Sequence, residues 1–251
     1  MNHGWLQTPL GAALLEAEQR LVQSAMEGIF GEVCVQVGQW GEPDAFIRFA
    51  RTQRAGVVGP QPDAGISLVS APDQLGIADD SVDLMLLPHT LDLCEHPHAA
   101  LREATRVLRS DGQLIVLAFK PGGLWGLKRL WPGSRFPDCA QRVVGERQLS
   151  DWLELLDLRV TAKERYFFKW PSDTGAEQTS PVWQQWGERF WPELAACYAL
   201  RAQKRLRTLI PLRSRWKPRK KVVAGLVKPS IRAVDSQRRV VSLPPSFWKR
   251  R

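Results

Sequence analysis

The sequence predicts an α/β fold in which helices cover both faces of a doubly wound, mostly parallel sheet. Three observations predict it: short apolar or β-branched runs recur along the chain, amphipathic helical patterns separate them, and glycines follow several of the runs. Strands that alternate with helices in this way form parallel sheets, because each helix carries the chain back across one face. A chain of 251 residues with 44% hydrophobic residues can bury a sizeable core for such a domain.

The amino-terminal part is expected to begin with a helix and to continue into short strands. Residues 10–30 repeat apolar side chains at helical spacing, and the β-branched run 33–37 predicts a strand that ends in a turn at Gly38. Pro43 is typical of the first turn of a helix, and an apolar face follows it. Further short strands are expected at residues 55–59 and 66–69.

The middle of the chain contains the strongest strand signals. Residues 82–87 read VDLMLL and residues 113–119 read QLIVLAF, and such continuous apolar runs are typical of strands that are covered on both faces. Between them, residues 97–108 have a helical apolar stripe that ends before Gly112. Beyond them we expect a helix at 147–156, a strand at 159–170, an aromatic helix at 182–191 and a closing strand at 196–204.

Composition limits the class of protein. No run of about eighteen uncharged apolar residues exists, which argues against a membrane-spanning helix. The start of the chain lacks the basic and apolar regions of a signal peptide, so a cytoplasmic location is expected. The four cysteines follow no disulfide or zinc-ribbon spacing, which suits reduced thiols.

Charge is strongly segregated along the chain. Residues 201–251 contain seventeen lysines and arginines but a single acid, Asp235, so this segment carries about +16. Because the net charge of the chain is +9, the first 200 residues carry about −7. We therefore expect three regions: an amino-terminal helical region (1–32), a folded domain (33–204) and an extended basic tail (205–251). Interleaved tryptophans make RNA or another polyanion the leading partner of the tail, while an anionic membrane surface and a purely solubilising role remain alternatives.

One segment of the chain carries a family resemblance. Residues 75–127 read LGIADDSVDLMLLPHTLDLCEHPHAALREATRVLRSDGQLIVLAFKPGGLWGL. The acidic-Ser turn, the Val-Asp strand start, the Arg-Val-Leu helix end and the Asp-Gly turn resemble the type 11 family of class I S-adenosylmethionine-dependent methyltransferases. The pieces LLPHTLD and FKPGGLWGLKRL resemble a proteobacterial subgroup of uncharacterised methyltransferase-like proteins. The resemblance implies a Rossmann-like class I methyltransferase fold for residues 33–204, with S-adenosylmethionine as cofactor and an acceptor that the sequence does not identify.

The resemblance also implies where the cofactor binds. In open α/β sheets, ligands bind beyond the carboxyl ends of the strands, near the point where the strand order reverses. The corresponding residues in this sequence are Gln36, Gly38, Gln39, Trp40, Gly59, Ala71, Pro72, Leu87 and Pro88. His89 follows the fourth strand and is the candidate general base, and the alternative is a histidine that only bonds to the loop backbone. Asp92, one turn later, either orients His89 or simply begins the loop.

Three polar anchors of the family are missing. Gln36 replaces an acid and Trp40 replaces the second glycine in the loop VQVGQWGEP. The acid that usually holds the ribose hydroxyls is absent, with Asp63 the nearest carboxylate, and Ala71 stands where an acid contacts adenine. Two hypotheses follow: a methyltransferase that binds its cofactor by backbone groups and stacking, or a catalytically inactive scaffold that binds RNA or a ribonucleoprotein through its tail.

Two other groups of residues were weighed as sites. Cys94, His96 and His98 lie within five residues, but they lack the spacing and the distant partners of a metal centre, so we interpret them as a loop before Pro97. The tryptophans of the 170–191 stretch are interpreted as core packing rather than as an acceptor pocket. They are Trp170, Trp183, Trp186 and Trp191.

Overall fold

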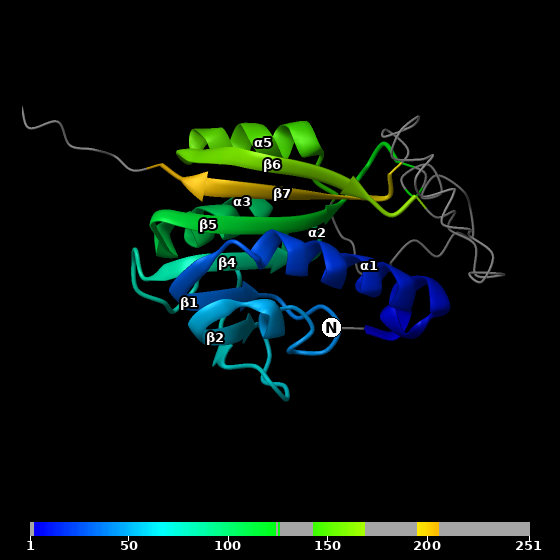
Figure 1. The fold of residues 1–251 in the computed structure, drawn as a ribbon, viewed down its shortest axis with the longest axis horizontal. Coiled ribbons are helices and arrows are strands. Elements are labelled where there is room, and N and C mark those ends of the chain that lie inside the picture. Colours follow the sequence, from blue (N-terminus) through cyan, green and yellow to red (C-terminus); the bar gives the residue numbers. More distant parts are fainter. Residues whose placement is uncertain (1–2, 124, 126–142, 169–194, 206–251) are drawn as a thin grey trace, which may run out of the picture. The chain divides into compact units, whose positions relative to one another are not determined.

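A seven-stranded sheet forms the centre of the computed structural model, which describes residues 3–123, 125, 143–168 and 195–205 of the 251. The strand order is β3-β2-β1-β4-β5-β7-β6 (Figure 1). Neighbours from β3 to β5 pair in parallel, and β7 pairs antiparallel with both β5 and β6. The predicted doubly wound, mostly parallel sheet is confirmed, with its three most apolar strands (β1, β4 and β5) side by side.

The amino-terminal half contains a long helix and the first three strands. Helix α1 follows a short 3-10 helix, η1, and Thr8 caps it: the Thr8 hydroxyl accepts a hydrogen bond from the Gly11 N–H at 3.1 Å. The bounds are η1 His3–Gln7, α1 Pro9–Met26, β1 Phe30–Val37, η2 Ile47–Phe49, β2 Arg51–Gly59 and β3 Leu68–Val69.

The second half of the described chain completes the sheet. Its elements are β4 Val82–Pro88, α2 Thr90–Leu93, α3 Pro97–Val107, β5 Leu108–Phe119, α5 Glu146–Leu155, β6 Leu158–Tyr166 and β7 Cys197–Lys204. The helices predicted at 97–108 and 147–156 and the strands predicted at 159–170 and 196–204 are therefore present, with ends that differ by a few residues. The helix expected at 182–191 and its tryptophans lie outside the described residues, as does the chain beyond Arg205.

Two predicted boundaries near the amino terminus were wrong. The helix expected to reach residue 30 ends at Met26, because the backbone from Phe30 onward pairs with β2, beginning at Arg51. The helix expected after Pro43 is only the single turn η2, since β2 begins at Arg51 and leaves no length for a longer helix.

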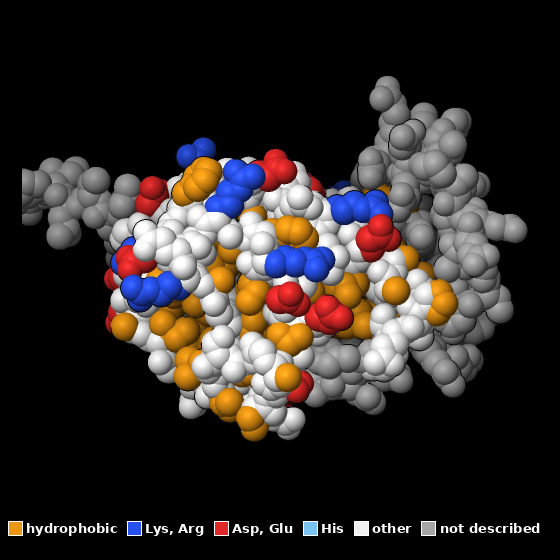
Figure 2. All heavy atoms as spheres, turned by 60° about the horizontal axis from the view of Figure 1, so that its bottom comes forward, with side chains coloured by type: hydrophobic (Ala, Val, Ile, Leu, Met, Phe, Trp, Pro, Cys, Tyr) orange, Lys and Arg blue, Asp and Glu red, His pale blue; other side chains and the backbone are white. Residues whose placement is uncertain are grey.

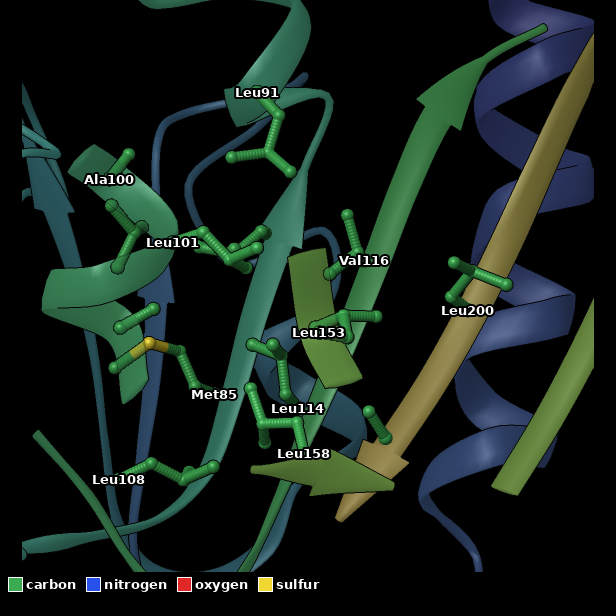
Figure 3. Close-up of a cluster of buried hydrophobic side chains, with 14 of the residues drawn as sticks. Met85, Leu91, Ala100, Leu101, Leu108, Leu114, Val116, Leu153, Leu158 and Leu200 are labelled. Carbon is green, nitrogen blue, oxygen red and sulfur yellow. The ribbon is translucent and has the colours of Figure 1, made fainter. Parts of the chain in front are cut away.

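Two hydrophobic clusters cover the two faces of the sheet. On one face, α3 and α5 pack on β4, β5 and β7, and Leu101, Leu114 and Leu153 are fully buried there (Figure 3). On the other face, α1 packs on the opposite side chains of β4 and β5 and on an aromatic group. The members of this aromatic group are Trp40, Phe46, Phe119, Trp125 and Phe167.

The surface of the described residues mixes charged and hydrophobic side chains. On the face turned forward in Figure 2, acidic and basic side chains lie next to one another among hydrophobic ones, so the described residues visible there form no patch of a single charge. Within the described part of the chain, no helix is both long enough and apolar enough to cross a membrane.

Candidate functional site

A cavity of about 490 Å³ opens at the carboxyl ends of β1 and β2. This is the point where the strand order reverses, because β2 and β3 lie on one side of β1 and β4 lies on the other. We call it the Gly38 cavity. The residues that line it are Gly38, Pro60, Gln61, Pro72, Asp73, Thr90, Leu93, Cys94, Glu95 and His96. Its volume is in the range of pockets that hold cofactor-sized ligands.

Gly38 forms part of the wall of this cavity, at a position where another residue would be strained. Its φ is +88°, in the left-handed region, and a Cβ at this position would lie 2.8 Å from the Thr90 hydroxyl oxygen. That hydroxyl donates a hydrogen bond to the Val37 carbonyl and is therefore fixed. The turn after β1 brings bare backbone to the cavity, as the sequence predicted for this glycine.

Gln36 is buried behind the strand end and braces the turn. Its side-chain Nε2 donates to the Gly38 carbonyl at 3.0 Å, while its Oε1 has no hydrogen-bond partner among the described residues. A buried acceptor without a donor is costly, so this oxygen is suited to a ligand that brings a donor.

Trp40 does not line the cavity. Its ring is buried beneath α1, its Nε1 donates to Glu18 Oε2 at 2.8 Å, and its ring centroid lies 4.4 Å from that of His89. The bulky residue at the second glycine position thus fills the core on the α1 face, beside the cofactor loop.

The other predicted cofactor residues are divided between several places. Pro72 lines the Gly38 cavity, whereas Gln39 and Gly59 line an adjacent hollow of about 70 Å³ together with Asp63, and Pro60 and Gln61 line both. Ala71 is exposed, and Leu87 and Pro88 are buried within β4; none of these three lines either space.

Two polar residues at the cavity were missed by the sequence analysis. Gln61 follows the end of β2 by two residues, and Asp73 lies two residues before Leu75, whereas an acid was sought four residues before it. The loop 93–96 was also missed as a wall of the cavity, although Cys94 and His96 had been considered for another role. His98 faces away, with its ring packed edge-on against Trp152 at 5.3 Å.

His89 lies in a closed network of carboxylates and not at the cavity. Its Nε2 is 2.7 Å from Glu18 Oε1 and its Nδ1 is 3.1 Å from Asp92 Oδ2, and all three side chains are fully buried. Burial alone would lower the pKa of His89, but Glu18 and Asp92 outweigh it and raise this pKa to about 9. The side chain is an imidazolium at neutral pH, which makes it an ion-pair partner and leaves it no lone pair to act as a general base.

Glu18 is the member of this network that the sequence analysis overlooked. It lies on α1 between the buried residues Leu14 and Val22, at positions i, i+4 and i+8 of one helical face. A carboxylate on an otherwise apolar stripe is a detectable signal, because it must find a buried partner. Asp92 orients His89 as predicted, and its Oδ2 also accepts from the Phe119 N–H at 2.9 Å.

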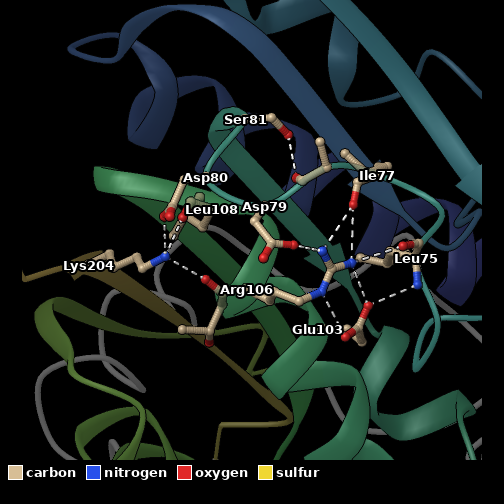
Figure 4. A network of polar contacts seen from close by, with 11 residues as sticks. Leu75, Ile77, Asp79, Asp80, Ser81, Glu103, Arg106, Leu108 and Lys204 are labelled. Carbon is tan, nitrogen blue, oxygen red and sulfur yellow. Dashed lines mark hydrogen bonds and ion pairs between the residues drawn. The ribbon is translucent and has the colours of Figure 1, made fainter. Parts of the chain in front are cut away.

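The residues that carry the family resemblance hold a loop in place. Arg106, at the end of α3, donates to the carbonyls of Leu75 and Ile77 and pairs with Asp79 and Glu103 (Figure 4). On the other side of the same turn, Lys204 of β7 contacts Asp80 at 2.7 Å and the Thr105 carbonyl at 2.9 Å (Figure 4). These motif residues fix the approach to β4 and leave the cavity to other side chains.

Comparisons with known proteins agree with this geometry. Residues 46–116 match the family described as a methyltransferase domain. A S-adenosylmethionine-dependent methyltransferase from Thermotoga maritima superposes with a TM-score of 0.58 at 18% identity, over 80% of this chain and 93% of its own. Residues 46–116 therefore resemble a methyltransferase domain, and the superposition shows that the chain shares the fold of this Thermotoga maritima enzyme.

Two curated relatives resemble part of this chain. The uncharacterized protein YafS of Escherichia coli (strain K12) is 42% identical over 103 residues, which cover 40% of this chain and 42% of YafS. A malonyl-(acyl-carrier protein) O-methyltransferase of Methylococcus capsulatus is 33% identical over 88 residues, which cover 35% of this chain and 30% of that enzyme. The matches span less than half of either relative.

The fold alone does not select a reaction. The cyclase SpnF superposes on this chain with a TM-score of 0.52 at 18% identity, over 78% of this chain and 82% of its own. Function is therefore argued from the site.

Proposed function

We propose that this chain binds S-adenosylmethionine in the Gly38 cavity and transfers its methyl group to an acceptor. The observation that carries the proposal is the position of this cavity: it opens at the strand-order reversal of a class I methyltransferase domain, against a turn that only glycine can form. Bare backbone at Gly38 lets a ligand approach without a side chain between them.

The polar lining fits the nucleoside part of the cofactor. Gln61, beyond the end of β2, offers an amide that both donates to and accepts from ribose hydroxyls. Asp73, beyond β3, offers a carboxylate that accepts from the adenine amino group. These two residues take the places of the ribose and adenine acids that the sequence lacks at the usual positions.

The amino-acid part of the cofactor requires an acceptor for its ammonium group. Gln36 Oε1 is a buried acceptor without a partner among the described residues, and its own Nε2 is held at the Gly38 carbonyl. Gln36 is fully buried and does not line the Gly38 cavity, so the ammonium would reach this oxygen only if the Gly38 turn shifted on binding. In that case it would contribute a charge-assisted hydrogen bond, the stronger class of such bonds.

When bound, the cofactor supplies an electrophilic methyl group on a sulfonium, whose bond to sulfur breaks as the bond to the acceptor forms. The chain's contribution is to bind and orient, and positioning of this kind supplies a large share of rate. His89 is buried and protonated, so proton removal falls to the acceptor's own acidity or to the carboxylate and imidazole of Glu95 and His96, which line the cavity.

Calorimetry with the full chain tests the proposal. We expect S-adenosylmethionine and S-adenosylhomocysteine to bind with one site per chain, and Asp73→Asn to weaken binding about tenfold through loss of a hydrogen bond to a charged group. Asp151→Asn is the matched control, because Asp151 is an exposed residue of α5 that lines neither space, and its substitution should leave the affinity unchanged. Absence of binding at millimolar cofactor, or equal effects of the two substitutions, would contradict the assignment.

Transfer itself is measured with methyl-labelled cofactor. The chain is incubated with RNA, protein and small-molecule extracts as separate acceptor pools, and label is counted in each. Incorporation that disappears in Asp73→Asn identifies the acceptor class, whereas no incorporation in any pool despite cofactor binding would contradict the transfer step.

A catalytically inactive scaffold that binds RNA through the tail is the second candidate. The observation that favours it is the charge of about +16 in residues 201–251, which would attract phosphates and make binding steeply dependent on salt. It replaces the first proposal if the cofactor does not bind and RNA is retained.

A further inference from the structure

Three metal-ligating side chains from distant parts of the sequence meet beneath α1. Glu18 comes from α1, His89 follows β4, and Cys197 begins β7; one ligand atom of each lies within 4.8 Å of the other two. All three residues are 0% exposed. Among the described residues, this is the one group of three or more such side chains with ligand atoms so close together.

We propose that Glu18, His89 and Cys197 form a binding site for a divalent ion of the zinc type. Carboxylate oxygen, imidazole nitrogen and thiolate sulfur are the donors that zinc takes in proteins, at about 2.0–2.3 Å. Glu18 Oε1 and His89 Nε2 are 2.7 Å apart, so small movements of the side chains would let both ligate one ion. The site lies apart from the Gly38 cavity, and none of its three residues lines that cavity.

The groups around these ligands are arranged as the outer shell of a metal site. Asp92 accepts from His89 Nδ1, which leaves Nε2 to face Glu18 and Cys197. Metal-bound histidines commonly donate their second ring N–H to a carboxylate in this way, which fixes the tautomer and raises the basicity of the ligand. Glu18 is oriented in turn by Trp40 Nε1 on Oε2, at 2.8 Å, and by the Tyr166 hydroxyl on Oε1, at 3.1 Å.

The local charge favours a cation. The carboxylates of Glu18 and Asp92 both lie within hydrogen-bond distance of His89. A bound divalent ion would offset their negative charge, and the Cys197 thiol would bind it as a thiolate. Binding would release one proton from His89 Nε2 and one from Cys197 Sγ, and both bonds to hydrogen would be replaced by bonds to the ion.

Full burial determines what such an ion does. Aromatic rings enclose His89, with the Trp40 ring at 4.4 Å and the Phe119 ring at 4.2 Å between centroids. An ion without access to bulk water would be structural, with its fourth donor supplied by a neighbouring buried group such as the Tyr166 hydroxyl, and it would join α1, the loop after β4, and β7. It would enter while the chain folds, before α1 closes over the sheet.

Metal content and cobalt spectra of the tag-free full chain test the site. The chain is refolded with Zn²⁺ or Co²⁺, desalted and analysed for bound metal, and we expect about one ion per chain and a cobalt–thiolate charge-transfer band. Cys197→Ser should remove the band and lower metal affinity by at least tenfold. Asp92→Asn should keep the band but weaken affinity by roughly 10–100-fold, as outer-shell substitutions do.

Cys34→Ser is the matched control. Cys34 is equally buried, on β1, but it is outside the ligand group, so this variant should retain both the metal and the band. Near-ultraviolet circular dichroism verifies that each variant folds. The proposal is overturned if the refolded wild-type chain holds no stoichiometric metal, or if Cys197→Ser keeps the same band and affinity as Cys34→Ser.

Discussion

Substitution of Gly38 by alanine separates the geometry of the cofactor turn from the stability of the domain around it. Alanine at φ +88° is in the left-handed region, which costs a non-glycine residue about 1–2 kcal/mol. Its Cβ would also lie 2.8 Å from the Thr90 hydroxyl oxygen, an overlap in a packed region that costs roughly 1–3 kcal/mol. Together these effects should lower the free energy of unfolding by about 2–5 kcal/mol.

Urea unfolding measures this loss. With a slope of roughly 2 kcal/mol per molar urea, the midpoint of Gly38→Ala should fall by about 1–2.5 M. Gly28→Ala is the control, because a Cβ at Gly28 meets nothing within 4 Å and its φ is not positive; it should leave the midpoint unchanged or raise it slightly.

A double substitution separates the backbone cost of alanine at Gly38 from the steric cost of its contact with Thr90. Thr90→Ala removes the atom that the new Cβ would strike, so Gly38→Ala should cost less in the Thr90→Ala background than alone, and the remainder is the backbone cost. The reasoning is refuted if Gly38→Ala is no more destabilising than Gly28→Ala. It is also refuted if Gly38→Ala destabilises the chain but binds S-adenosylmethionine with unchanged affinity.

Three further predictions concern the core, an acidic group and the tail. Leu101→Ala should lower the free energy of unfolding by about 2–5 kcal/mol, since Leu101 is fully buried between α3 and the sheet, and urea unfolding measures it. Burial would raise the pKa of Asp83, but hydrogen bonds from the N–H groups of Glu32 and Val33 and from Arg109 outweigh it and lower this pKa. The stabilisation by the Asp83 carboxylate is therefore present above the pKa of Asp83 in the unfolded chain, near 3.9, and is lost as the pH falls through its lower pKa in the folded chain. Urea midpoints between pH 3 and pH 7 should consequently depend less on pH in Asp83→Asn than in the wild type. A chain that ends at Arg205 should keep its fold and lose RNA retention in gel shifts at two salt concentrations; equal retention by both chains would assign RNA binding elsewhere.

The sheet was predictable because its signals are local. The runs VDLMLL and QLIVLAF are short, continuous and apolar, which is typical of strands covered on both faces. Their alternation with helical patterns predicts that the strands pair in parallel. The end of the first helix was less predictable, because Phe30 continues the apolar pattern of the helix but pairs with Arg51, which is a long-range contact. Local periodicity identifies an element and does not identify its partner.

The candidate site was predictable only where the backbone conformation determines its position. Gly38 was found because a strand that ends in glycine marks a turn at the sheet edge. Trp40 was assigned to the cofactor because it replaces a glycine, yet its indole N–H pairs with Glu18, 22 residues earlier. His89 was assigned as a base from its place after β4. The two carboxylates that contact its ring belong to Glu18, 71 residues before it, and to Asp92, 3 residues after it.

The division between the motif and the cavity explains how a chain can keep a family's signature and change its site. Arg106 bonds to backbone carbonyls of residues 75 and 77, so it holds a loop whatever ligand binds nearby. The residues that line the Gly38 cavity lie instead in the loops after strands, such as Gln61 after β2 and Asp73 after β3, and they can be exchanged without removing the bonds of Arg106. The usual acids can therefore disappear from their places while the Arg-Val-Leu signature remains, and cofactor affinity must be measured at the Gly38 cavity rather than inferred from the signature.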